Sequence, residues 1–598
     1  MAPIFRNFIS VVRRYKMAVV LNILGLSVAF AAFMVIMIQL NYDFGFDKFH
    51  KDYDKIFRLE MAPKSSTPYA VISRPLAERF FESSPAIVAG AITNPLGNLW
   101  GGDPFFHVET NGVRKSFKEK ALQVSPELTD VFTFDIVEGA ADALKTPGHV
   151  MIPLSMARKF FGNESAVGQQ LFYESDNQTV GAVYRDFPTN TVLSNYIYVS
   201  FPENENKDNW GAFNYHVYIR VNEVSNVSML VDNFFRNFDI QAAIGDMFNW
   251  AESGLTIQLT ALPDIHFAAD IQYDTSQKAS RQMLMILFAI ALVIIAIAAI
   301  NFTNFSTALT PKRIKNINTQ RVLGARQRTL RFALVFEAVA VSVLSYIVAL
   351  ALIALFNGSS LAGLVDADLS FSAQPLIIGG TALVALLAGL LAGLYPARYM
   401  TSFAPALVLK GSFGLSPKGR KLRNTLIGIQ FIASFALIIG ASFMFLQNNY
   451  MQQSALGYDK DALITVDIRQ IQKNRDAFTN QLKSFSGIEG VTYSQFLLSS
   501  SDSYMKWGRP YKGDRITFQV LPVHHSFLEV MGIEIDEGRH FREEDTHTQQ
   551  GAWIFNESSK KQYNMELNSV LNDFSSDKKT GGEVIGFIKT QTGYTGRY

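Results

Sequence analysis

The chain contains no cysteine, which excludes disulfide bonds, thiol catalysis and zinc sites built on cysteine. The zinc-protease pattern H-E-x-x-H and the hydrolase pattern G-x-S-x-G are also missing from it. His524 and His525 form the one adjacent histidine pair, and neighbours on a strand point to opposite faces, so this pair does not predict a metal site. We therefore expect no catalytic residues, no metal and no bound cofactor.

A nucleotide site of its own is missing as well. The nearest approach to the phosphate-binding pattern G-x-x-x-x-G-K-[ST] is "GLSPKGRK" (414–421). There Arg420 replaces the lysine that would bind phosphate, and Lys421 replaces the hydroxyl residue that would bind magnesium. The charges are also nearly balanced, with 54 Lys and Arg against 52 Asp and Glu, so no overall basic field predicts a nucleic-acid partner.

Long apolar runs are what the chain has in abundance. It is 48% hydrophobic and only 18% charged, too apolar for an ordinary soluble domain. A transmembrane helix needs roughly 20 apolar residues. The runs that meet this length are 17–40, 283–305, 333–356, 375–395 and 425–446. The first continues beyond the length of a signal peptide, which predicts an uncleaved anchor.

The charges between these runs alternate in sign. Segments 1–16, 306–332 and 396–424 hold Lys and Arg without any acid, whereas 357–374 holds Asp366 and Asp368 without any base. Because basic loops stay in the cytoplasm, the N-terminus is predicted to be cytoplasmic. The predicted order is a cytoplasmic segment (1–16), TM1 (17–40), a periplasmic core domain (41–282), TM2 (283–305), a cytoplasmic coupling loop (306–332), TM3 (333–356), a short periplasmic loop (357–374), TM4 (375–395), a cytoplasmic linker (396–424), TM5 (425–446) and a second periplasmic domain (447–598).

The two outer segments are predicted to be mixed α/β domains. Residues 213–221 alternate as a strand does, 179–187 resemble a buried strand, and 153–162 resemble a short helix ended by Gly162. The predicted fold class is therefore an α-helical membrane protein with five transmembrane helices and two extracytoplasmic mixed α/β domains.

An internal repeat relates the two outer domains. "DVFTFDIVEG" (130–139) matches "EVMGIEIDEG" (529–538), and 155–161 and 179–187 match 558–563 and 583–589 in the same order. The second copy stops soon after its last match. The sequence thus predicts that the second domain is incomplete, and we expect a longer form from which this chain is truncated or frame-shifted.

Two stretches resemble a known family. The first is "STALTPKRIKNINTQRVLGARQRTLRFALVFEAVAV" (306–341), and the second is "LAGLYPARYMTSFAPALVLKG" (391–411). Both are similar to MacB/FtsX-like ABC transporter permeases, in the double-length form found in Bacteroidetes. The matching residues are Arg321, Val322, Leu323, Gly324, Ala325 and Glu337 in the first stretch, and Gly393, Tyr395, Pro396, Ala397, Pro405, Lys410 and Gly411 in the second.

The resemblance implies a permease subunit, not an enzyme, of the bacterial inner membrane. A separate cytoplasmic ABC ATPase dimer would use ATP and bind the coupling loop at Arg321, Val322, Leu323, Gly324, Ala325 and Arg326. The helices would then move the periplasmic domains, a mechanotransmission mechanism that serves efflux of drugs, peptides or lipoproteins. A periplasmic adaptor, an outer-membrane channel and membrane lipid are further partners that the family implies.

Two alternatives stay open. One is an FtsX-like signalling scaffold that activates a periplasmic cell-wall hydrolase. The other is a degenerate, inactive copy, because the acid that the family carries just before Arg321 is replaced in "NINTQ" (316–320). Glu337 is a candidate at the membrane interface. Its acid within an apolar run indicates either a functional group or a favourable charge near a helix N-terminus.

Overall fold

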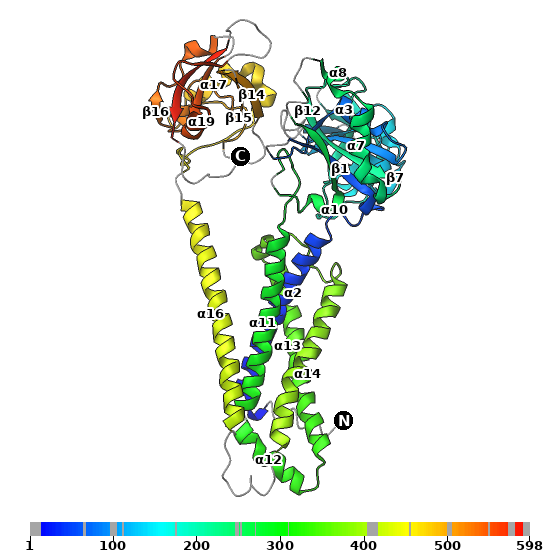
Figure 1. Ribbon diagram of the computed structural model, residues 1–598, viewed down its shortest axis with the longest axis vertical. Coiled ribbons are helices and arrows are strands. Elements are labelled where there is room, and N and C mark those ends of the chain that lie inside the picture. Colours follow the sequence, from blue (N-terminus) through cyan, green and yellow to red (C-terminus); the bar gives the residue numbers. More distant parts are fainter. Residues whose placement is uncertain are drawn as a thin grey trace. The chain divides into compact units, whose positions relative to one another are not determined.

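The computed structural model describes residues 13–63, 67–95, 105–110, 113–173, 176–245, 250, 254–269, 271–308, 310–402, 417–453, 456–498, 505–512, 514–547, 551–571 and 581–589. The chain divides into two compact units, Met1–Ile438 and Ile439–Tyr598. The first unit contains four long apolar helices and a large α/β domain, and the second contains a smaller α/β domain (Figure 1).

Five helices of the described chain are long and apolar enough to cross a membrane, as the sequence predicts. They are α2 (Lys16–Phe44), α11 (Arg281–Ala308), α13 (Gln327–Asn357), α14 (Pro375–Thr401) and α16 (Pro417–Gln453). The helix α14 extends beyond the predicted end at 395, with Pro396 inside it. The exact limits of the predicted domains stay predictions.

In the first unit, α2, α11, α13 and α14 run side by side as a bundle (Figure 1). Small residues bring α13 and α14 close together. A Cβ atom on Gly389 would lie 2.8 Å from the Cβ of Ser342, and one on Gly393 would lie 2.6 Å from the Cβ of Ala338. Packing of this kind replaces the hydrophobic driving force that is missing between helices in lipid.

The large domain is built on one sheet of 13 strands. Its path of neighbouring strands is β13-β1-β12-β3-β6-β11-β8-β10-β9-β4-β5, with β2 paired to β12 and β7 paired to β10. The strands are β1 (Ile56–Ala62), β2 (Ile72–Ser73), β3 (Ile87–Asn94), β4 (Phe105–Thr110), β5 (Val113–Lys118), β6 (Ala121–Val124), β7 (Ile136–Gly139), β8 (His149–Pro153), β9 (Gln170–Tyr173), β10 (Asp176–Tyr184), β11 (Ile197–Ser200), β12 (Phe213–Val221) and β13 (Thr256–Ala261).

Both faces of this sheet are covered. Tyr215, Val217 and Ile219 of β12 belong to one core cluster, which includes residues of α3 and α7. Tyr218 of the same strand belongs to a second cluster, with residues of α5 and α10. The strand predicted at 213–221 is therefore confirmed, but it is buried on two faces rather than one. The helices of this domain are α3 (Arg74–Phe81), α5 (Leu128–Val131), α6 (Leu154–Phe161), α7 (Val227–Asn237), α8 (Ile240–Ile244) and α10 (Leu262–Ile265).

The second unit contains a hairpin of β14 (Met505–Tyr511) and β15 (Asp514–Val520) and a separate four-stranded sheet. That sheet has the order β16-β19-β17, with β18 paired to β19. Its strands are β16 (Ile535–Gly538), β17 (Ala552–Asn556), β18 (Val570–Leu571) and β19 (Gly582–Ile588). The unit also contains the end of α16 and the short helices α17 (Arg475–Lys483), α18 (Phe527–Val530) and α19 (Glu557–Tyr563).

The strand pairings of the two units agree with the internal repeat. In the first unit β10 pairs antiparallel with β7 and β9 and parallel with β8. In the second unit β19 pairs antiparallel with β16 and β18 and parallel with β17. The parallel ladders even shift register at matching places, skipping Gly181 in β10 and Ile585 in β19. The similarity found in the sequence therefore reflects one repeated fold.

Candidate functional site

The basic segment between α11 and α13 forms a helix and a tight turn. The helix α12 (Thr310–Val322) is followed by a turn that contains Gly324, whose φ is +95°. The amide of Ala325 donates to the carbonyl of Gln320 (2.9 Å) and the amide of Gly324 donates to that of Arg321 (3.0 Å). These two bonds are the Schellman pattern, which needs a left-handed residue at the helix end. We call α12, this turn and the first turn of α13 the basic elbow (residues 310–331).

The structure assigns Gly324 to the turn that ends α12. It lies after the helix, and a Cβ there would meet no atom within 4 Å. Its conformation, and not a lack of space, is therefore what requires glycine. Binding of a partner at Gly324 and Ala325 stays a prediction.

Side chains of the elbow form hydrogen bonds to the last turn of α14. Gln327 Nε2 and Arg321 Nη1 donate to the carbonyl oxygen of Thr401, at 2.7 and 3.3 Å. Arg331 Nε donates to the hydroxyl of Thr401 at 2.9 Å. Terminal carbonyls of a helix have no partner within it and attract positive charge. The contacts to Thr401 therefore hold the turn at a fixed position.

Glu337 is part of an ion pair that joins α13 to α12. Both of its carboxylate oxygens accept from Arg313 Nη2 at 2.7 Å, and the Arg313 guanidinium lies 5.7 Å from the ring centre of Tyr15. The two charged side chains are only 11% and 19% exposed. Sequence reasoning selected Glu337 but missed Arg313, because the partners are 24 positions apart on different helices.

One side of the elbow stays uncovered. Val322 is 61% exposed and Leu323 is 82% exposed, while Ile317 and Leu330 of the same elbow are buried with Met400. Arg326 and Arg328, which follow soon after in the chain, are exposed too. An apolar tip with basic neighbours, on a base that is already packed, has the composition of a docking surface.

The second family stretch helps to build the same region. Gly393 packs on Ala338, next to Glu337, and Ala397 is buried with its carbonyl bonded to the Thr401 hydroxyl (2.9 Å). The ring of Tyr395 stacks on that of Tyr399 with 6.0 Å between centres. Gly393, Tyr395, Pro396 and Ala397 thus all lie in α14, although the last two follow the predicted end of TM4 at 395. Pro405, Lys410 and Gly411 lie outside the described residues.

Two protein-family models match the chain. The FtsX-like permease C-terminal model matches residues 288–405, and the MacB-like periplasmic core domain model matches residues 19–234. The first covers the elbow and most of the bundle, and the second covers most of α2 and every strand of the large sheet except β13. Fold and matches together define a membrane permease with a periplasmic α/β domain. In particular, the chain is a MacB/FtsX-like permease.

Three solved structures are similar to part of the chain. A domain of a putative permease from Porphyromonas gingivalis is 21% identical and covers 40% of this chain and 99% of its own, with a TM-score of 0.30. The periplasmic region of MacB from Actinobacillus actinomycetemcomitans is 12% identical and covers 34% of this chain and 88% of its own, with a TM-score of 0.25. The extracellular domain of the noncanonic ABC-type transporter YknZ from Gram-positive bacteria is 12% identical and covers 34% and 99%, with a TM-score of 0.23. A search of curated proteins found no match.

Proposed function

We propose that this permease is the non-catalytic membrane subunit of an ATP-driven system, and that the basic elbow binds a separate cytoplasmic ABC ATPase. The observation that carries the proposal is the exposed pair Val322 and Leu323, presented on a turn that contacts to Thr401 hold in place. The hydrogen bonds between the elbow and Thr401 support the proposal. Because of them, a movement of the docked ATPase would act on α13 and α14 rather than be absorbed by a loose loop.

In this proposal the elbow faces the cytoplasm of a bacterium and the α/β domains face the periplasm. The positive-inside rule supports that orientation, since the elbow holds arginines and lysines and no acid. ATP would be used by the partner, and the permease itself would need no cofactor. Closing of the helices would move the outer domains and drive efflux by mechanotransmission, with a periplasmic adaptor and an outer-membrane channel as further partners.

The test replaces the most exposed apolar residue of the elbow. Leu323→Asp puts a charge at the centre of the proposed contact without touching Gly324 or the Thr401 bonds. We expect recovery of an ATPase subunit with the affinity-purified full chain to fall about tenfold, which corresponds to about 1.4 kcal/mol. Quantitative mass spectrometry of the complex purified from its native membrane measures this recovery.

The matched control is Leu364→Asp, because Leu364 is 78% exposed in the loop between α13 and α14, on the side predicted to be periplasmic. That variant should recover the ATPase as the parent does. Equal recovery by Leu323→Asp and the parent would reject the elbow as the docking surface. Recovery of a cell-wall hydrolase in place of efflux partners would favour the signalling scaffold.

A further inference from the structure

A segment without helix or strand connects the large α/β domain to α11. We call residues 271–280 the return segment. Its polar backbone groups bond to several other parts of the domain. The carbonyl of Gln272 accepts from the amide of Ala70 (2.9 Å), that of Tyr273 accepts from His216 Nε2 of β12 (2.8 Å), and the amide of Ala279 donates to the carbonyl of His266 (2.9 Å). Irregular backbone inside a protein needs such partners, and here they tie the segment to the domain.

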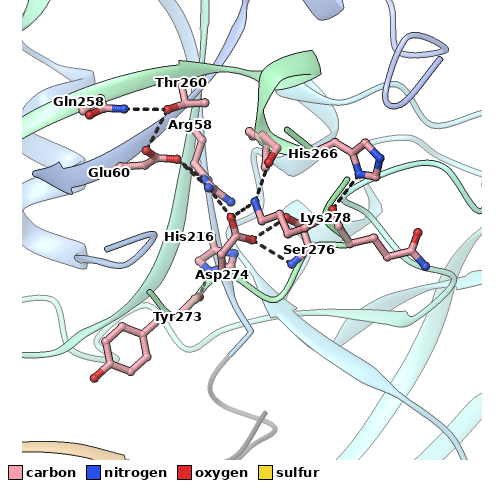
Figure 2. A network of polar contacts seen from close by, with 12 residues as sticks. Arg58, Glu60, His216, Gln258, Thr260, His266, Tyr273, Asp274, Ser276 and Lys278 are labelled. Atoms are coloured by element: carbon pink, nitrogen blue, oxygen red, sulfur yellow. Dashed lines mark hydrogen bonds and ion pairs between the residues drawn. The ribbon is translucent and has the colours of Figure 1, made fainter. Parts of the chain in front are cut away.

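Asp274 of the return segment is the centre of a cluster of charged and polar side chains (Figure 2). Its carboxylate accepts from Arg58 Nη2 of β1 at 2.6 Å and from Lys278 Nζ, and Arg58 Nη2 also donates to Glu60 at 2.6 Å. Glu60 in turn accepts from the hydroxyl of Thr260 on β13 (2.9 Å). The cluster therefore joins the return segment to two neighbouring strands of the sheet.

Two positive and two negative side chains balance in this cluster, and all of them except Lys278 are fully buried. Arg58 and Glu60 have side chains with no exposure, and that of Asp274 is 1% exposed. Burial would raise the pKa of Asp274, but the charge and hydrogen bonds of Arg58 hold it well below its ordinary value. A buried ion pair contributes little net stability as a whole, yet removal of one partner leaves an uncompensated buried charge. The cluster therefore depends on every member.

The return segment also holds α2. The hydroxyl of Tyr42 donates to Gln277 Oε1 (3.0 Å), and His266 Nδ1 lies 2.8 Å from the Gln277 carbonyl. His266 Nε2 lies 2.9 Å from Asp43 Oδ1 of α2, and its ring stacks on Phe46 at 3.9 Å. His266 thus lies between the return segment and α2, with one ring nitrogen facing each of them.

We infer that the return segment locks α2 and α11 to the sheet of the large domain as one rigid body, with Asp274 as the positioning residue. The α11 helix begins at Arg281, directly after the segment, so no free linker separates helix from domain. The inference names the residues through which a movement of the helices would reach the outer domain. That role rests on the proposed function. The lock itself is a property of the permease alone.

The experiment measures how tightly the domain is held to the bundle in the full chain, without any ATPase. Because the chain contains no cysteine, pairs of introduced cysteines take spin labels cleanly. Val137→Cys with Leu355→Cys places one label on β7 and one on α13, at side chains 40% and 72% exposed. In lipid nanodiscs the parent should give one narrow distance distribution. Asp274→Asn keeps the shape and removes the charge, and should widen the distribution about twofold.

Two controls separate positioning from stability. A second label pair, Val88→Cys with Val137→Cys, lies within the sheet domain and should stay narrow in Asp274→Asn, whereas a merely destabilised domain would broaden both pairs. Asp264→Asn removes a carboxylate whose partner, Arg281, is 59% exposed, and should change neither distribution.

If Asp274→Asn fails to fold, Tyr42→Phe provides the second variant, since it removes only the hydroxyl bonds to Gln277 and Thr189. It should broaden the Val137–Leu355 pair alone, by less than Asp274→Asn. A broad parent distribution, or variants as narrow as the parent, would overturn the inference. These outcomes are independent of ATPase recovery, so the lock and the proposed docking fail separately.

Discussion

At the scale of single residues, the buried histidines of the large domain couple its stability to pH. Burial lowers the pKa of His216 to about 4 and that of His50 to about 3. Burial raises the pKa of Asp47 to about 7, against the bonds it accepts from Thr191 and Val192. Each histidine adds stability that is present above the unfolded value of 6.5 and lost as the pH falls. Asp47 acts in the opposite direction, since its contribution is present below pH 3.8 and lost as the pH rises toward 7.

Two histidines against one aspartate predict that the domain loses stability as the pH falls from 6.5 toward 4. His216→Gln keeps a donor for the Tyr273 carbonyl but cannot titrate, so it should flatten this slope by about 1.4 kcal/mol per pH unit. The measurement is urea unfolding of the full chain at pH 6.5 and pH 5, with hydrogen exchange of β12 as the signal that monitors unfolding. His540→Gln, an exposed change in the other unit, should leave the slope unaltered. A slope unchanged in His216→Gln would contradict the linkage.

The pair of Arg313 and Glu337 leads to a second prediction at this scale. Glu337→Gln leaves the mostly buried Arg313 guanidinium without its carboxylate, and should destabilise the packing of α12 by about 2 kcal/mol. Hydrogen exchange of residues 310–322 in nanodiscs should accelerate accordingly.

Arg328→Gln is the control, because Arg328 is exposed on the same elbow. The double variant Arg313→Leu with Glu337→Leu should recover part of the protection, since an apolar pair leaves no buried charge unpaired. Unchanged exchange in Glu337→Gln would show that the ion pair does not hold α12.

At the scale of secondary-structure elements, two glycines explain why the repeated strands can pair so closely. Gly139 and Gly538 end β7 and β16 with φ of +83° and +96°. A Cβ on Gly139 would lie 2.2 Å from the carbonyl oxygen of Gly181, and one on Gly538 would lie 2.2 Å from that of Ile585. Both positions therefore combine a left-handed backbone with direct contact to the central strand.

Alanine at either glycine should cost about 3 kcal/mol, since the clash with backbone adds to the conformational strain. Gly551→Ala is the control for Gly538→Ala. Gly551 also has a positive φ, of +64°, but open space around it, so about 1 kcal/mol is expected from strain alone. Urea titration of the full chain, monitored by hydrogen exchange of β19, compares the free energies of unfolding of Gly538→Ala and Gly551→Ala. Equal losses in the two variants would show that the close approach contributes nothing.

At the scale of the whole molecule, the sequence predicts the arrangement of helices and domains but not the contacts that fasten them. Apolar length is a local property, which is why the five membrane helices could be recognised from composition. The repeat could be recognised because "DIVEG" and "EIDEG" keep the same strand end, including its glycine. The turn at Gly324 was within reach too, because glycine after a helical run is a helix-ending signal.

The tertiary structure alone decided which charges meet. Arg58 and Asp274 are 216 positions apart, and nothing in the pattern around either one indicates the other. The same holds for Thr401. Its carbonyl accepts hydrogen bonds from side chains of the elbow because α14 ends next to the elbow. The sequence by itself determined the helices, their basic and acidic sides and the duplicated outer fold, since spacing and charge act along the chain. The structure determined the lock beneath the outer domain and the pinned elbow, because ion pairs and helix-end contacts depend on distance through space.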